Sequence, residues 1–259
     1  MGCTERDFLK HGDIATMNGK RFDNVTFSTY TCPTHIHRLY APGMLSALVA
    51  SHKCEFGEII LVRQRCKDID VGMPEIECHV LETENYPNIY KDFNIIENNP
   101  LADKHSGHNG PLDQFTPSED LKYWWKYHTN QLIVLKEAHT DYIVFSDDDA
   151  PLLGDDPEYS WVERGIKELI HNKQLIMVSA GHGLNGTWGN DEIHTIMSLQ
   201  VCIINRERFL SMDYETPLPP GIDWWSYHFM LEGRIWRYAM KHDLRRLILG
   251  RPVIGHLEW

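Results

Sequence analysis

Short apolar runs alternate with amphipathic segments along most of the chain, and this alternation restricts the fold more than any other feature. The runs expected as strands are residues 22–34, 57–65, 76–83, 142–146, 175–180, the start of 198–210, and a closing strand near 247–256. The segments expected as helices are residues 41–53, 118–140, 158–172, the end of 198–210, and a last helix starting at Asp223. Such alternation is typical of an α/β protein. We therefore expect a mostly parallel central sheet with helices on both faces.

Length and composition favour some classes of protein over others. The 259 residues suffice for one large α/β domain or two small ones. The formal net charge of −12 disfavours a groove that follows nucleic-acid phosphates, since such grooves need clustered Lys and Arg. The chain start has no apolar leader, and no window approaches about 18 unbroken apolar residues, so we expect a cytoplasmic protein without a membrane span. The six cysteines form no CxxC pair and are expected to be reduced.

One apolar run, at residues 142–146, leads directly into Asp147, Asp148 and Asp149. Ligands of such sheets bind beyond the carboxyl ends of the strands. Carboxylates two residues apart at a strand end point the same way and can share one hard cation. Mg²⁺ or Mn²⁺ bound by one or two carboxylates keeps open positions, which substrate phosphates fill. The alternative interpretation is a solvated turn that caps the following helix, with Pro151 ending the strand.

Four short segments in the right order resemble GT-A glycosyltransferases, most closely the inverting family 2 group. They are VTFSTYTCPT, KEAHTDYIVFSDDDA, GIDWW and RPVIGH. The resemblance implies a single GT-A (Rossmann-like) domain over residues 1–259. Within it, 1–20 would be an N-terminal extension, 22–150 a nucleotide-binding half and 151–259 an acceptor-binding half.

The resemblance also implies roles for individual residues. Thr29, Tyr30 and Thr31 would line the nucleotide pocket. Asp147 would contact hydroxyls of the donor, Asp148 would be the least essential residue of the donor-binding tract, and Asp149 would bind the metal.

Two further roles follow from the later segments. Asp223 would be the general base that takes the proton of the acceptor hydroxyl, although Ile222 stands where the family usually has Glu. His256 would be a metal ligand through its neutral imidazole. A base of this kind typically supplies about 10²–10⁴-fold in rate.

The end of the second strand departs from the family pattern. The family commonly has Asp-Asp-Gly-Ser there, whereas this chain has VRQRCKD. Arg63 and Gln64 are expected to contact a base edge or a phosphate of the donor, or else to be surface charges. Whether the donor carries uridine, as is usual in the family, is therefore left open by the sequence.

The acceptor site is expected in the second half of the chain. His182 lies in the glycine-rich run GHGLNGTWGN, which can approach a sugar closely, and Trp224 and Trp225 adjoin the expected base. The close histidine pairs in THIH (34–37) and HSGH (105–108) are interpreted as polar loop residues.

The sequence thus predicts a metal-dependent inverting glycosyltransferase that uses Mn²⁺ or Mg²⁺. It would move a sugar from a nucleoside-diphosphate sugar to an acceptor glycan, small molecule or other hydroxyl-bearing polymer, and a nucleic-acid acceptor stays open. The alternatives are an Asp-x-Asp phosphotransfer hydrolase, a nucleotidyltransferase and a non-catalytic carbohydrate-binding module. In the hydrolase class the nucleophilic aspartate lies near the chain start, and Thr or Val occupies the position where this chain has Pro151. This chain departs from that pattern at both points.

Overall fold

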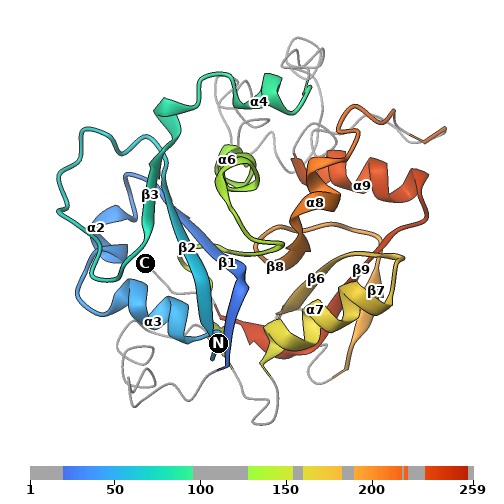
Figure 1. Cartoon of the computed structure of the whole chain (residues 1–259), viewed down its shortest axis with the longest axis horizontal. Coiled ribbons are helices and arrows are strands. Elements are labelled where there is room, and N and C mark those ends of the chain that lie inside the picture. Colours follow the sequence, from blue (N-terminus) through green and yellow to red (C-terminus); the bar gives the residue numbers. More distant parts are fainter. Residues whose placement is uncertain are drawn as a thin grey trace, which may run out of the picture.

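The computed structural model describes residues 20–95, 128–153, 160–182, 190–217, 219–220 and 231–255, with His182 described in its backbone only. These residues form one mixed sheet with helices on both faces (Figure 1). The strands are β1 (Arg21–Thr31), β2 (Glu55–Arg63), β3 (His79–Glu82), β4 (Tyr142–Ser146), β5 (Leu152–Leu153), β6 (Leu175–His182), β7 (Glu192–His194), β8 (Val201–Asn205) and β9 (Arg245–Ile254). The helices are α2 (Ile36–Leu39), α3 (Met44–Ala50), η1 (Thr83–Asn85), α4 (Ile89–Asp92), α6 (Thr129–Glu137), α7 (Trp161–His171), α8 (Arg206–Leu210) and α9 (Leu231–Lys241).

The sheet has the strand order β3-β2-β1-β4-β8-β6-β9-β5, with β7 also paired to β9. Strands β1, β2, β3 and β4 are parallel to one another. Strand β8 runs against its neighbours β4 and β6, and β9 is again parallel to β6. The short strands β5 and β7 run against β9. The expected mostly parallel α/β sheet is therefore confirmed, with one antiparallel strand in its middle.

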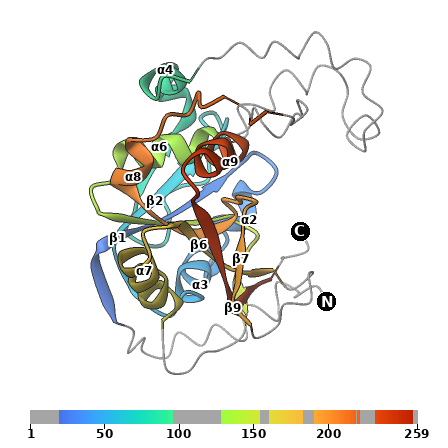
Figure 2. The same cartoon turned by 90° about the vertical axis from the view of Figure 1, so that its right-hand side faces the viewer.

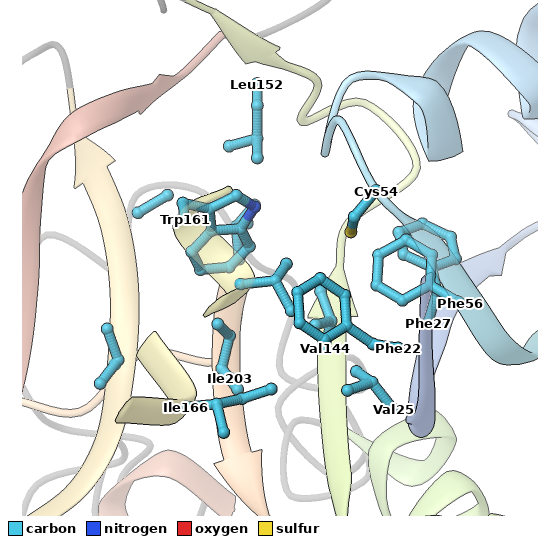
Figure 3. Packing of buried hydrophobic residues seen from close by; sticks show 14 of the residues in the cluster. Phe22, Val25, Phe27, Cys54, Phe56, Val144, Leu152, Trp161, Ile166 and Ile203 are labelled. Carbon is cyan, nitrogen blue, oxygen red and sulfur yellow. The ribbon is translucent and has the colours of Figure 1, made fainter. Parts of the chain in front are cut away.

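Helices α3 and α7 cover one face of the sheet because alternate strand residues point to that face. Val25 and Phe27 of β1 and Val144 of β4 belong to a buried cluster with Trp161 and Ile166 of α7 (Figure 3). All five side chains are at most 8% exposed. Burial of such side chains stabilises the fold by about 1.5–3 kcal/mol each.

Helices α6, α8 and α9 cover the opposite face (Figure 2). Ile143 and Phe145, the neighbours of Val144 along β4, pack there in a second buried cluster. Leu132 and Leu135 of α6 and Ile235 of α9 belong to the same cluster and are fully buried. Since β4 is buried on both faces, its central residues 143–145 form the continuous apolar run that is typical of a central strand.

Two features of the described residues differ from the sequence expectations, and two expected helices are described only in part. Strands β5 and β7 were not expected, because strands of two or three residues show no periodicity. Residues 84–95, which lie outside the expected strands and helices, include the short helix α4. The expected helices at 118–140 and from Asp223 are described only from Thr129 and Leu231 onward.

Within the described ranges, no helix combines the length and the apolar character that crossing a membrane requires.

Candidate functional site

Four parallel strands end together at one edge of the sheet. Thr31 of β1 pairs with Arg63 of β2, which pairs with Glu82 of β3. Thr29 pairs with Ser146, so the aspartates that follow β4 begin level with the end of β1. The backbone N–H of Asp147 donates to the carbonyl of Gln200 at 2.9 Å, just before β8 begins. This edge is where α/β sheets bind their ligands.

Asp147 lies in an acidic environment on the α9 side of this edge. Burial is the main reason that its pKa lies well above the ordinary value, and the charges of Asp149, Asp148 and Glu232 raise it further. A hydrogen bond from the Tyr30 side chain opposes the shift. Several carboxylates share a small region here, which favours binding of a cation.

Asp148 has a partner of its own. Its side chain is only 4% exposed, and both carboxylate oxygens lie 3.1 Å from Nδ1 of His35. Burial raises the pKa of Asp148 to about 6, and His35 opposes this shift. His35 was interpreted as a polar loop residue, and only the tertiary structure pairs it with the tract.

The tract forms a turn, since the N–H of Ala150 donates to the carbonyl of Asp147 at 3.2 Å, but this turn does not cap a helix. Asp148 is buried in it, and the chain continues through Pro151 into strand β5.

The end of β9 lies beside the same tract. Leu152 of β5 pairs with Ile254, and the N–H of Gly255 donates to the carbonyl of Pro151 at 2.8 Å. His182, at the end of β6, also pairs with Ile254. His256 follows Gly255 directly but lies outside the described residues, as do Asp223, Trp224 and Trp225.

Glu232, in the first turn of α9, is a site residue that sequence reasoning missed. Its Oε1 accepts the N–H of Leu199 at 2.6 Å and lies 3.7 Å from Nε2 of His128. Burial raises its pKa, and its charge acts on Asp147. Its spacing in the sequence could have identified it as buried. Glu232 lies three residues before Ile235 and seven before Ala239, and so falls on the apolar face of the helix.

The expected donor-binding residues of β1 and β2 lie at the site edge, but several have structural contacts. Arg63 Nη2 donates to the carbonyls of Cys66 at 2.7 Å and Ile69 at 2.8 Å, and its Nε lies 3.2 Å from Glu82. The backbone N–H of Gln64 donates to the carbonyl of Thr31 at 2.8 Å. These contacts hold the loop after β2 against β1 and β3.

The threonines flanking Tyr30 are buried, whereas Tyr30 itself is half-buried. A donor role for Thr29, Tyr30, Thr31, Arg63 and Gln64 stays a prediction.

Within the part of the chain that the structure describes, no three His, Cys, Asp or Glu side chains are grouped as a ready metal site. Asp147 and Asp149 nevertheless supply two carboxylates, and Mg²⁺ that also binds a diphosphate usually needs only one or two from the protein. Hard oxygen ligands fit Mg²⁺ or Mn²⁺ by their chemistry. The residues present therefore fit such an ion.

The fold and the site define an α/β protein with an acidic cluster at the carboxyl edge of its parallel strands. No protein-family model matches the chain, and no curated protein matches it.

Solved structures show distant overall likeness. A TarS fragment from S. aureus has a TM-score of 0.46 at 12% identity, over 90% of this chain and 60% of that one. The chain thus spans less than two thirds of that structure. Glucosyl-3-phosphoglycerate synthase from Mycobacterium tuberculosis, with Mn²⁺, UDP-glucose and phosphoglyceric acid, has a TM-score of 0.42 at 12% identity, over 100% and 78%. CMP:2-keto-3-deoxy-manno-octonic acid synthetase with CTP has a TM-score of 0.42 at 8% identity, and the match covers 87% of this chain and 89% of that one. Likenesses at this level do not establish a shared activity.

Proposed function

We propose that this chain is a metal-dependent inverting glycosyltransferase that transfers a sugar from a nucleoside-diphosphate sugar to an acceptor hydroxyl. The observation that carries the proposal is the aspartate tract at the end of β4. It lies at the ligand-binding edge of the sheet, level with the end of β1, with Asp147 in an acidic cluster and Asp148 buried against His35. This arrangement suits a cation shared between protein carboxylates and a diphosphate.

Asp149 would hold the divalent ion, Mn²⁺ or Mg²⁺, and Asp147, which is expected to contact hydroxyls of the donor, would supply a second carboxylate. His256 is the expected third ligand, and the hydrogen bond from Gly255 to Pro151 supports this because it brings the chain beside the tract just before residue 256. A bound divalent ion of this kind stabilises negative charge on a departing diphosphate as a Lewis acid.

Two carboxylates are candidates for the general base. Asp223 is implied by the family resemblance. Glu232 is supported by geometry, because its carboxylate is fixed by the Leu199 N–H and its charge acts on Asp147. A general base must lie within hydrogen-bond reach of the hydroxyl that attacks the donor. Inversion then needs one displacement and no covalent intermediate.

The donor would contact Thr29, Tyr30, Thr31 and Gln64 at the ends of β1 and β2. Arg63 would act there through the loop that it holds, since its guanidinium already binds the carbonyls of Cys66 and Ile69.

The acceptor would contact His182, Trp224 and Trp225, which the sequence predicts for this role. We propose a glycan, a small molecule or another hydroxyl-bearing polymer, with a modified base in nucleic acid as a further candidate.

Calorimetric titration of UDP, GDP, CDP and dTDP, each with and without Mn²⁺, tests the donor site. One nucleotide should bind in a metal-dependent manner, and Asp149→Asn should weaken this binding at least about 10-fold. Asp141→Asn is the matched control, because Asp141 is exposed at the opposite end of β4. Binding that is indifferent to metal and to Asp149 would favour the phosphohydrolase or the non-catalytic module.

A further inference from the structure

We propose that His35 contacts the nucleoside half of the donor and that buried Asp148 positions it there. This inference rests on the proposed function. His35 Nδ1 lies 3.1 Å from both oxygens of Asp148, whose side chain is 4% exposed, whereas that of His35 is 30% exposed. A buried carboxylate that holds a partly exposed imidazole is an arrangement that fixes the ring toward a ligand.

The Asp148 carboxylate determines the tautomer and the orientation of the His35 ring. An ionised carboxylate only accepts hydrogen bonds, so Nδ1 carries the proton that it donates to Asp148. This bond fixes the orientation of the ring. Nδ1 faces its buried partner, and the His35 side chain as a whole is 30% exposed, so the ring lies partly open at this edge of the sheet.

The backbone around His35 is fixed as well. The carbonyl of Cys32 accepts the N–H groups of His35 at 3.0 Å and Ile36 at 2.9 Å, directly after the end of β1. The ring therefore projects from an ordered turn at the ligand-binding edge of the sheet.

The position of Asp148 indicates which half of the donor His35 would meet. Asp147 to Ala150 form a turn at the end of β4, in which the N–H of Ala150 donates to the carbonyl of Asp147 at 3.2 Å. The carboxylates of this turn have different partners: Asp147 interacts with Tyr30 and Glu232, whereas Asp148 contacts His35. The metal and the diphosphate would lie with Asp147 and Asp149. His35, beside β1, would meet ribose hydroxyls or the base edge.

The competing explanation is that His35 only satisfies the buried carboxylate. Two substitutions separate the explanations. His35→Asn keeps an amide donor near the position of Nδ1 but removes the far edge of the ring. His35→Gln places its amide near the position of Nε2. His37→Asn, an exposed histidine two residues along the chain, is the control.

Binding of the nucleotide selected by the wild type is measured by calorimetry, as the diphosphate with Mn²⁺ and as the monophosphate without metal. We expect His35→Asn to weaken both about 10-fold, the value of one hydrogen bond of about 1.4 kcal/mol, and His35→Gln to weaken them less. Wild-type affinity in His35→Asn would reduce His35 to a structural partner. If His35→Asn lost affinity only for the diphosphate, His35 would contact the phosphates and not the nucleoside, which would overturn the proposal. Absence of nucleotide binding by the wild type would instead overturn the proposed function.

A second measurement needs no variant and covers the case in which the substitutions unfold the protein. Diethyl pyrocarbonate modifies accessible histidine rings, and peptide mass spectrometry locates the adducts. The bound nucleotide should protect His35 at least about 3-fold, an effect of about 0.6 kcal/mol or more, and should leave His37 unchanged. Equal modification of His35 with and without nucleotide would refute the contact.

Discussion

The indole N–H of Trp161 donates to Nδ1 of His52 at 3.1 Å inside the core between helix α7 and the sheet. Both side chains are buried, at 4% and 1% exposure. The ring of His52 also meets Phe27 edge-on, with centroids 5.0 Å apart. Trp161 is the first residue of α7 and His52 follows α3, so this bond joins the two helices that cover one face of the sheet.

Replacing Trp161 by Phe removes the donor and leaves Nδ1 of His52 buried without its partner. An unsatisfied buried polar group costs about 1–3 kcal/mol. We therefore expect Trp161→Phe to lower the free energy of unfolding by about 2 kcal/mol in urea titrations. Ile170→Val, at a position of α7 that is 46% exposed, should change it by less than about 0.5 kcal/mol. Equal stability of the two variants would contradict a contribution from the bond.

His52 should make the protein sensitive to acid. Burial lowers its pKa from 6.5 to about 3. The unfolded chain therefore binds a proton at this residue below about pH 6.5, whereas the folded protein does not, so stability is present above that pH and falls as pH decreases.

His52→Asn keeps an acceptor for Trp161 but cannot titrate. Between about pH 7 and about pH 5, the free energy of unfolding of the wild type should fall by roughly 2 kcal/mol more than that of His52→Asn. The difference isolates His52 from His128, whose pKa burial also lowers to about 3. Parallel pH profiles of wild type and variant would show that His52 does not carry this effect.

Gly57 of β2 lies against the backbone of β1. A Cβ at this position would collide with the carbonyl of Asp23, near the register shift between Phe22 and Thr26. Since backbone cannot move aside cheaply, Gly57→Ala should destabilise the protein by at least about 2 kcal/mol in thermal or urea unfolding. Gly72→Ala is the comparison, because Gly72 has φ of +73° but open space around it. It should cost only about 1 kcal/mol. A smaller cost at Gly57 than at Gly72 would contradict the close strand contact.

The two candidate bases predict different kinetics. If Glu232 takes the acceptor proton, Glu232→Gln should lower kcat by about 10²–10⁴-fold while donor binding changes little. Asp223→Asn should then have the smaller effect. Single-turnover assays with the donor selected by calorimetry measure both variants. The opposite order would assign the base to Asp223, and full activity of both variants would exclude a carboxylate base at either position.

His256 follows the last described residue, Gly255, and is expected to bind the metal. His256→Ala should weaken Mn²⁺ binding about 10–100-fold without a change in thermal midpoint. His242→Ala, at an exposed residue whose ring packs at a tilt against Tyr238, is the control. Unchanged Mn²⁺ affinity in His256→Ala would remove His256 from the site.

The sequence by itself predicted the α/β class and the position of the acidic tract. Both depend on local patterns: apolar runs of strand length, amphipathic segments, and aspartates immediately after a strand. Strand β4 is an example, because its central residues Ile143, Val144 and Phe145 are buried on both faces of the sheet and are all apolar.

Contacts between distant residues decided the rest. Sequence reasoning assigned His35 to a polar loop, yet it lies against Asp148, 113 residues away. Arg206, at the start of α8, donates to the carbonyls of Leu135 at 2.9 Å and Lys136 at 3.1 Å, and so satisfies the end of α6.

The strand order also belongs to the tertiary structure. Periodicity reports which face of a segment is buried but not which segment buries it, so the antiparallel position of β8 beside β4 and the pairing of β9 with β5 do not follow from the sequence pattern. That second pairing places Gly255 beside Pro151. The aspartate tract was thus fixed by a local sequence pattern, whereas its neighbours His35, Glu232 and Gly255 were decided by packing, because only the folded sheet brings their distant segments to one edge.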